Sequence, residues 1–116
     1  MKVLICGDRN WRDYTAIKQY VSSLPPNTVI IEGDARGADQ LAGLAAKEQG
    51  LPTEIYPAQW AIYGRAAGPI RNKQMLDEGK PDLVVYFHLD LDSSKGTKDM
   101  VTRATKAGIP VINGGQ

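Results

Sequence analysis

The sequence predicts an α/β fold of the Rossmann-like class, an open parallel five-stranded sheet with helices on both faces. Short apolar runs alternate with segments of helical length along the whole chain. At least three of these runs are apolar throughout, without the alternation of a half-exposed strand, which is typical of parallel strands covered on both faces. With right-handed crossovers between parallel strands, the simplest strand order is 3-2-1-4-5.

Five strands are expected, and each is rich in apolar or β-branched residues and bounded by Gly, Pro, Asp or Asn. They are residues 3–6, 28–31, 53–56, 83–87 and 110–112.

Helices are expected between the strands, because apolar residues recur there at near-helical spacing. The stripes are Tyr14, Ile17, Val21 and Leu24, then Leu41, Ala42 and Ala45, then Met100, Val101, Ala104 and Ala107. Pro25 and Pro26 end the first helix, while Gly50 and Gly108 lie where a left-handed C-terminal cap needs a residue without Cβ. The order of elements is therefore β-α-β-α-β-α-β-α-β.

Length and composition predict one domain over residues 1–116. Fourteen Lys+Arg against 13 Asp+Glu leave a net charge of +1, which excludes a polybasic or acidic disordered chain. No apolar run approaches the ~18–20 residues of a membrane span, and the first apolar run is too short for a signal peptide, so a soluble cytoplasmic protein is expected. The single cysteine, Cys6, excludes an internal disulfide and a thiolate zinc site, and we expect it to be a small buried hydrophobe.

The carboxyl edge of the predicted sheet is where function is expected. The longest irregular stretches, residues 57–68 and 88–96, both follow a strand's carboxyl end. In open α/β sheets ligands bind at that edge, near the point where the strand order reverses. Long loops in a small domain are usually functional or mobile.

Four loops at this edge hold nearly all the unusual residues, namely residues 7–12, 33–39, 66–72 and 94–99. Glycine beside a helix start lets an anion approach backbone N–H groups, so phosphate is the expected ligand group. No loop matches the Walker A or the Gly-x-Gly-x-x-Gly pattern, which argues against ATP hydrolysis and NAD-dependent hydride transfer. We expect no cofactor and no bound metal.

Five ordered motifs resemble the YspA-type (YpsA-related) branch of the SLOG superfamily. They are Gly-Asp-Arg-Asn-Trp at 7–11, Glu-Gly-Asp-Ala-Arg-Gly-Ala-Asp-x-Leu-Ala at 32–42, Pro-Ala-Gln-Trp at 57–60, Ala-Gly-Pro-Ile-Arg-Asn-x-x-Met at 67–75 and Gly-Thr-x-Asp-Met at 96–100. The resemblance implies a Rossmann-like fold that binds nucleotides or nucleotide-derived ligands. It also implies kinship with the lonely-guy phosphoribohydrolases and the DNA-processing protein A group, and self-association into a homo-oligomer.

Two segments are similar to catalytic segments of the lonely-guy phosphoribohydrolases, in which an arginine and an acid assist cleavage of an N-glycosidic bond. Arg71-Asn72-Lys73 with Met75 resembles their Arg-Lys-x-x-Met stretch, and Gly96-Thr97-x-Asp99 resembles their Gly-Gly-x-Gly-Thr-x-x-Glu loop. The resemblance implies that Arg71 holds phosphate and that Asp99 supplies the acid. Here residues 88–95 replace the two expected glycines, and Lys95 partly restores an anion-binding charge.

The predicted ligand-binding residues come from these loops, and several have an equally simple structural interpretation. They are Gly7, Asp8, Arg9, Trp11, Gly33, Arg36, Gly37, Asp39, Asn72, Lys95, Gly96 and Thr97. Asp39, early in a helix, is more simply a first-turn dipole partner or cap. Arg36 suits phosphate or a surface ion pair, and Arg71 suits a ligand or a neighbouring carboxylate.

Further polar and aromatic residues carry weaker hypotheses. Trp11 and Trp60 either stack on a base or cover the rim of the core, and we favour the core for each. His88, Asp90 and Asp92 share one face if the fourth strand continues, which raises the possibility of a divalent metal against that of a solvated strand edge. The charged residues of the last predicted helix are interpreted as its solvated face; they are Lys98, Arg103 and Lys106.

Three functions follow as hypotheses. The first is a nucleotide-binding module for sensing or sequestration, with phosphate at residues 33–39 and 96–97 and the base near Trp11. The second is hydrolysis of a nucleoside monophosphate by Arg71 and Asp99, and the third is single-stranded DNA binding, which the balanced charge disfavours. All three depend on one prediction, that the amides opening the second and fourth helices converge with Arg71 in one pocket.

Overall fold

The computed structural model describes residues 1–115 and places five parallel strands in one sheet, in the order β3-β2-β1-β4-β5. The strands are β1 (Lys2–Gly7), β2 (Val29–Glu32), β3 (Thr53–Ile55), β4 (Leu83–Phe87) and β5 (Val111–Asn113). The main helices are α1 (Tyr14–Ser22), α2 (Ala38–Glu48), α4 (Ala67–Gly79) and α5 (Lys95–Lys106), with a short α3 (Trp60–Tyr63) and the 3₁₀ turns η1 (Gly64–Ala66) and η2 (Leu91–Ser93). The predicted fold class and strand order are confirmed.

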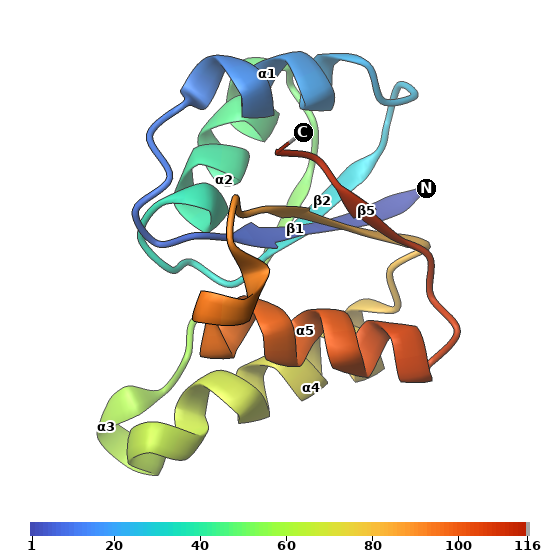
Figure 1. The fold of residues 1–116 in the computed structure, drawn as a ribbon. Coiled ribbons are helices and arrows are strands. Elements are labelled where there is room, and N and C mark those ends of the chain that lie inside the picture. The colour runs from blue at the N-terminus through green and yellow to red at the C-terminus, as the bar shows by residue number, and fades with distance from the viewer. Residues whose placement is uncertain (116) are drawn as a thin grey trace.

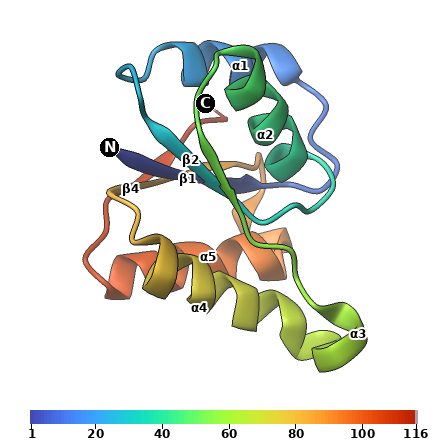
Figure 2. The ribbon, with the colours of Figure 1, turned by 180° about the vertical axis from the view of Figure 1, so that it is seen from behind.

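Helices α1 and α2 cover one face of the sheet, and α4 and α5 cover the other (Figures 1 and 2). Alternate residues of the central strand β1 serve the two cores: Val3 and Ile5 face α1 and α2, whereas Leu4 and Cys6 face α4 and α5. Because both faces are buried, β1 is apolar at every inner position, as the sequence predicts. Cys6 is buried as expected, and this burial raises the pKa of its thiol.

Helix ends follow the predicted chemistry where a cap residue is present. Asp13 accepts a hydrogen bond from the Ala16 N–H at the start of α1, and Ser94 accepts one from the Thr97 N–H at the start of α5. Gly50 and Gly108 follow α2 and α5 with φ of 71° and 77°, the left-handed geometry that a glycine adopts without a Cβ penalty.

The segments predicted as long loops contain more helix than the sequence indicates. Of residues 66–72, predicted as a loop, Ala66 ends η1 and residues 67–72 form the first turns of α4; Gly96 lies in the first turn of α5. Pro69 is compatible with this position because the first N–H groups of a helix have no intrahelical acceptor. Part of the 57–68 stretch forms α3 and η1, so Arg71 lies on a helix rather than in a loop.

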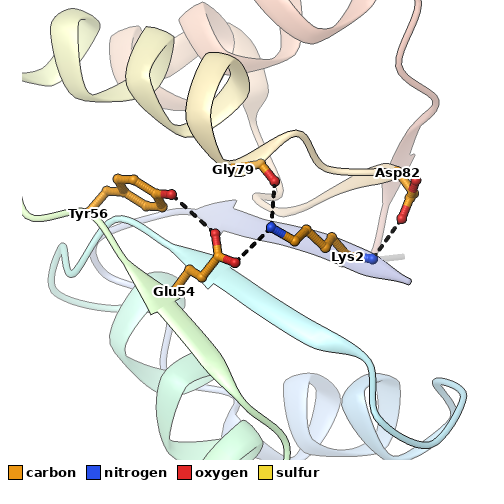
Figure 3. Close-up of polar contacts among 5 residues, drawn as sticks. All are labelled: Lys2, Glu54, Tyr56, Gly79 and Asp82. Atoms are coloured by element: carbon orange, nitrogen blue, oxygen red, sulfur yellow. Dashed lines mark hydrogen bonds and ion pairs between the residues drawn. The ribbon is translucent and has the colours of Figure 1, made fainter.

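Lys2 connects three elements on the α4 side of the sheet (Figure 3). Its Nζ donates to Glu54 Oε2 of β3 at 2.7 Å and to the Gly79 carbonyl oxygen at the end of α4 at 3.1 Å. Tyr56 donates to the other oxygen of Glu54, and the Lys2 backbone N–H donates to Asp82. A cation at a helix C-terminus is favourable, so this cluster holds the end of α4 against the sheet.

Across residues 1–115, none of the helices combines the length and the apolar character needed to cross a membrane.

Candidate functional site

The loops after β1 and β2 pack together at the carboxyl edge, beside the point where the chain order of the strands reverses between β1 and β4. Gly37 has φ of 84°, and a Cβ built there would collide with the Asp8 carbonyl oxygen. The Ala38 N–H donates to that same Asp8 carbonyl at 3.1 Å, and the Asp8 N–H donates to the Phe87 carbonyl of β4 at 2.9 Å. Gly37 therefore permits the close approach that joins the two loops.

A cleft of about 460 Å³ lies between these loops, and we call it the arginine cleft. Its lining residues are Arg9, Asn10, Trp11, Arg12, Arg36, Gly37, Gln40 and Leu41. All three arginines are exposed, and within the described part of the chain no carboxylate lines the cleft. Arg36 is oriented by weak hydrogen bonds from Nε to the Arg9 carbonyl at 3.4 Å and from Nη2 to Asn10 Oδ1 at 3.3 Å. An anion fits this arrangement.

Trp11 forms part of the cleft wall and is also packed on the core. Its ring meets that of Phe87 edge to face with centroids 5.6 Å apart, and its Nε1–H donates to the Asp13 carbonyl at 2.9 Å. The core interpretation of Trp11 is confirmed, and one part of its ring remains at the cleft. Trp60 is different: 57% of its surface is exposed on α3, so the core interpretation is wrong for this residue, because α3 buries none of its side chains.

Gly33 lies between a cation and an acid rather than in an open anion site. Arg71 Nη1 donates to the Gly33 carbonyl, and a Cβ at Gly33 would stand 2.5 Å from Arg71 Nη1 and 2.9 Å from Asp39 Oδ2. Asp39 is buried and accepts a hydrogen bond from the Ala35 N–H at 3.3 Å. The side chain of Asp39 therefore caps this turn from within the protein. In the predicted 33–39 site, Asp34 and Arg36 are exposed and Gly37 is partly exposed, and of these three Arg36 and Gly37 line the arginine cleft.

Glu32, which the sequence reasoning did not single out, is the second buried acid of this site. It ends β2 with 2% of its surface exposed and accepts a hydrogen bond from the Asp34 N–H. Burial raises the pKa of Glu32 to about 7 and that of Asp39 to about 6, although the Arg71 guanidinium and backbone N–H groups oppose both shifts. The sequence does contain a signal for this residue: Glu32 is an acid that directly follows an apolar strand and precedes a glycine. Perturbed acids at a sheet edge are typical of functional sites.

Asn72 links Arg71 to the start of α5. The Arg71 Nε–H donates to Asn72 Oδ1 at 3.1 Å, and Asn72 Nδ2 donates to the Gly96 carbonyl at 3.2 Å and to Asp99 Oδ2 at 3.0 Å. Through Gly33 at one end and Gly96 at the other, these bonds join the turn before α2 to the first turn of α5. The three elements therefore lie side by side, but they are joined through side chains and the Gly33 and Gly96 carbonyls, not through the amides that open α2 and α5. The predicted single pocket does not form between them: Gly37 lines the arginine cleft, whereas Arg71 lines a separate hollow along α4.

The first turn of α5 presents a smaller exposed surface than expected. Lys95 and Gly96 are exposed, and a Cβ at Gly96 would meet no atom within 4 Å. Thr97 is buried, and its N–H already donates to Ser94. Asp99 Oδ2 accepts from Arg103 Nε at 2.9 Å as well as from Asn72, so both the acid and Arg103 are engaged in structure. Lys98 and Lys106 are exposed, as expected for a solvated helix face.

The metal hypothesis for His88, Asp90 and Asp92 is wrong in its geometry, because β4 ends at Phe87 and the chain turns. His88 is buried, and its Nδ1 accepts a hydrogen bond from the Asp90 N–H at 2.9 Å. Within residues 1–115, no three His, Cys, Asp or Glu side chains come together as a metal site would require.

A second hollow of about 350 Å³ lies between the segment after β3 and the outer side of α4, and we call it the α4 groove. Its lining residues are Pro57, Gln59, Tyr63, Ala67, Ile70, Arg71, Lys73, Gln74, Asp77 and Glu78. It shares no lining residue with the arginine cleft. Arg71 borders the groove while it also holds Gly33, so it lies between the groove and the turn before α2.

Comparison with known proteins agrees with this architecture. A family model described as "YspA, cpYpsA-related SLOG family" matches residues 1–63. The chain is 37% identical over 123 aligned residues to the Gene 61 protein of Mycobacterium phage D29, covering 98% of this chain and 96% of that protein. Among solved structures it is similar to DNA processing protein A (DprA) from Streptococcus pneumoniae, with a TM-score of 0.74 and 21% identity. That match covers 95% of this chain and only 48% of the DprA chain.

Proposed function

Because the chain belongs to the YspA, cpYpsA-related SLOG family, we propose that it binds a nucleotide or nucleotide-derived ligand at the carboxyl edge of its sheet. The proposed role is sensing or sequestration. The observation that carries it is the arginine cleft, in which Arg9, Arg12 and Arg36 gather around one hollow at the edge where this class of fold binds ligands.

The proposed ligand contacts divide between phosphate and base. Arg36, held over the loop that follows β1, offers its guanidinium to a phosphate together with Arg9. Trp11 offers the side of its indole ring to a base. Gly7, Asp8 and Gly37 give the two loops their shape. Lys95 and Gly96, which are exposed, are proposed as a second, peripheral contact for a longer ligand, whereas Thr97 is buried and serves the start of α5.

Isothermal titration against a panel of purine and pyrimidine mono-, di- and triphosphates tests this proposal. We expect saturable binding by the wild type and a loss of about tenfold in affinity for Arg36→Ala, the usual scale for removing one charge-assisted contact. Arg65→Ala is the matched control, because Arg65 is an exposed arginine of η1 outside the cleft. No binding by the wild type at millimolar ligand, or equal losses in both variants, contradicts the proposal.

Binding of single-stranded DNA is a second candidate, favoured by two observations. The similar solved structure is that of a DNA processing protein, and the arginine cleft is open at the surface with three exposed cations. A strand would place successive phosphates along such a surface, with affinity falling steeply as salt rises. A gel-shift series with oligodeoxythymidine at low salt tests it, and absence of a shift there removes this candidate.

Hydrolysis of a nucleoside monophosphate by Arg71 and Asp99 is the weaker alternative. Asp99 Oδ2 already accepts hydrogen bonds from Asn72 and Arg103, and Arg71 is committed to the Gly33 carbonyl and to Asn72. This arrangement supports a positioning role for both residues. Release of a base from a nucleoside monophosphate by the wild type, slowed in Asp99→Asn, would favour hydrolysis over binding.

The proposed function also includes self-association of this chain into a homo-oligomer.

A further inference from the structure

Large apolar side chains gather on α3 and at the start of α4, in a set that we call the α3 patch. Its members are Trp60, Ile62, Tyr63 and Ile70, which are exposed by 57%, 69%, 47% and 42%. Helix α3 is four residues long, buries none of its side chains, and projects from the body of the molecule beyond the sheet (Figures 1 and 2). Four such residues within eleven positions differ from the scattered exposed hydrophobes of an ordinary monomer surface.

We propose that the α3 patch, together with the α4 groove beside it, is the contact surface between two copies of this chain. The inference rests on the self-association included in the proposed function and names its surface. The two copies meet through the same surface about a two-fold axis, so that the projecting α3 side chains of one copy enter the groove of the other.

The exposed apolar area is of the size that a dimer needs. Aromatic side chains bury about 150–250 Å² each, and an aliphatic side chain about half as much. With the exposed fractions given above, the four residues offer roughly 400 Å² per copy, or roughly 800 Å² for a pair. A standard interface buries about 1,600 Å² in total, a little over half of it apolar. The α3 patch therefore supplies the apolar core of such an interface, and the charged residues of the groove supply its polar rim.

The charges of the α4 groove favour a second copy of this chain over a partner whose surface carries only one sign of charge. The groove carries two cations, Arg71 and Lys73, toward the start of α4 and two acids, Asp77 and Glu78, near its end. Lys73 and Asp77 pair with each other while both stay more than half exposed, so each remains accessible across an interface. In an antiparallel pairing the basic half of one groove faces the acidic half of the other. A net charge of +1 per chain adds little repulsion.

The proposed contact leaves the arginine cleft accessible, because the two hollows share no lining residue. Nucleotide binding and dimer formation are therefore separable by mutation. Ile62, the most exposed member of the α3 patch, is the best site for a disruptive charge.

Sedimentation velocity over a wide dilution series, with the full chain, tests the surface. We expect a concentration-dependent dimer for the wild type, and for Ile62→Asp a dissociation constant raised by about tenfold or more, as for a central interface residue. Leu89→Asp is the matched control, because Leu89 is 75% exposed but lies after β4, outside the α3 patch. Circular dichroism confirms that both variants are folded.

Cross-linking gives a second measurement that does not depend on a disruptive charge. Cys6 is the single native cysteine and is buried, so Ile62→Cys introduces one accessible thiol. We expect a flexible bismaleimide cross-linker, which bridges thiols that lie too far apart for a disulfide, to join Ile62→Cys into a covalent dimer and to leave Leu89→Cys largely monomeric. If the wild type sediments as a monomer at every concentration, self-association and this surface both fail. If it is oligomeric and Ile62→Asp behaves like the wild type, only this surface fails. Neither outcome bears on nucleotide binding by the arginine cleft.

Discussion

The arginine cleft and the α4 groove are two hollows of similar size whose lining residues differ in charge. The cleft, of about 460 Å³, is lined by three arginines, and among the described residues that line it none is acidic. The groove, of about 350 Å³, carries both signs of charge and is bordered by exposed apolar side chains. Cationic lining suits an anionic small molecule, whereas balanced charge beside apolar side chains suits a protein surface.

The two regions also differ in how the chain builds them. The cleft lies between two loops that touch through backbone atoms, at a place where one glycine has left-handed backbone geometry. The groove lies between a helix and a projecting turn, with side chains as its walls. Substitutions at the packed residues of the cleft, Gly37 and Trp11, should therefore affect stability, whereas substitutions at the groove should be tolerated by the isolated fold.

Gly37→Ala should produce the largest effect, a loss of about 3 kcal/mol in the free energy of unfolding. The new Cβ would collide with the Asp8 carbonyl oxygen and with Arg9 backbone atoms, at a φ of 84° that alanine adopts poorly. Urea denaturation measures it. The control is Gly96→Ala, where nothing lies within 4 Å of the new Cβ and the change should stay within about 1 kcal/mol. Equal losses in the two variants would show that the loops do not pack as described.

The two tryptophans provide the next contrast. Trp11→Ala should cost about 2 kcal/mol of unfolding free energy, because the ring packs on Phe87 and is only partly buried. Trp60→Ala should cost less than about 0.5 kcal/mol at concentrations where the chain is monomeric, because its ring is mostly exposed. Thermal unfolding of both variants compares them directly, and a larger loss for Trp60→Ala would reverse the assignment of core and surface.

The buried acids predict a pH dependence with a defined sign. The folded-state pKa values of Glu32 and Asp39, about 7 and about 6, lie above their ordinary values, so the folded chain binds more protons than the unfolded chain in this range. Their contribution to stability is therefore greatest at acidic pH and declines as the pH rises toward 7. Glu32→Gln, which keeps an oxygen for the Asp34 N–H, should remove the share of Glu32 in the decline between pH 6 and 7, about 1 kcal/mol, and leave the smaller share of Asp39. Denaturation curves at several pH values measure it, and an unchanged slope in the variant would contradict the assignment.

Lys73→Ala should produce the smallest effect, at most about 0.5 kcal/mol in unfolding free energy, because its ion pair with Asp77 is an exposed i,i+4 pair. Nucleotide affinity should not change, since Lys73 lies in the α4 groove and not in the arginine cleft. Titration of this variant beside Arg36→Ala checks both statements. A matching loss of affinity would place the ligand in the groove.

The sheet was predictable from sequence because its information is local. Runs such as residues 83–87 are apolar at every position, and only a strand covered on both faces explains them. The strand order then followed from right-handed crossovers. The start of α4 was not predictable in the same way, since Gly68 and Pro69 are typical loop residues and only their position in the first helical turn makes them compatible with a helix.

The site was predictable as an edge but not as a set of contacts. The segments that hold Arg36, Arg71 and Gly96 were identified by their position after strands, and the structure joins them through the side chains of Arg71 and Asn72. The burial of Glu32 and Asp39 beside Arg71, and the exposure of Trp60, depend on how residues distant in sequence pack together. The spacing of residues along the chain does not predict those contacts.

The indole N–H signals of the two tryptophans offer the most direct measurement, because Trp11 lines the arginine cleft whereas Trp60 belongs to the α3 patch outside it. In a ¹H–¹⁵N spectrum of dilute protein, titration with a nucleotide should shift the Trp11 signal, which the Trp11→Ala variant identifies, and leave the Trp60 signal in place. A shift confined to Trp60, or no shift of either signal at saturating nucleotide, would contradict a nucleotide site in the arginine cleft.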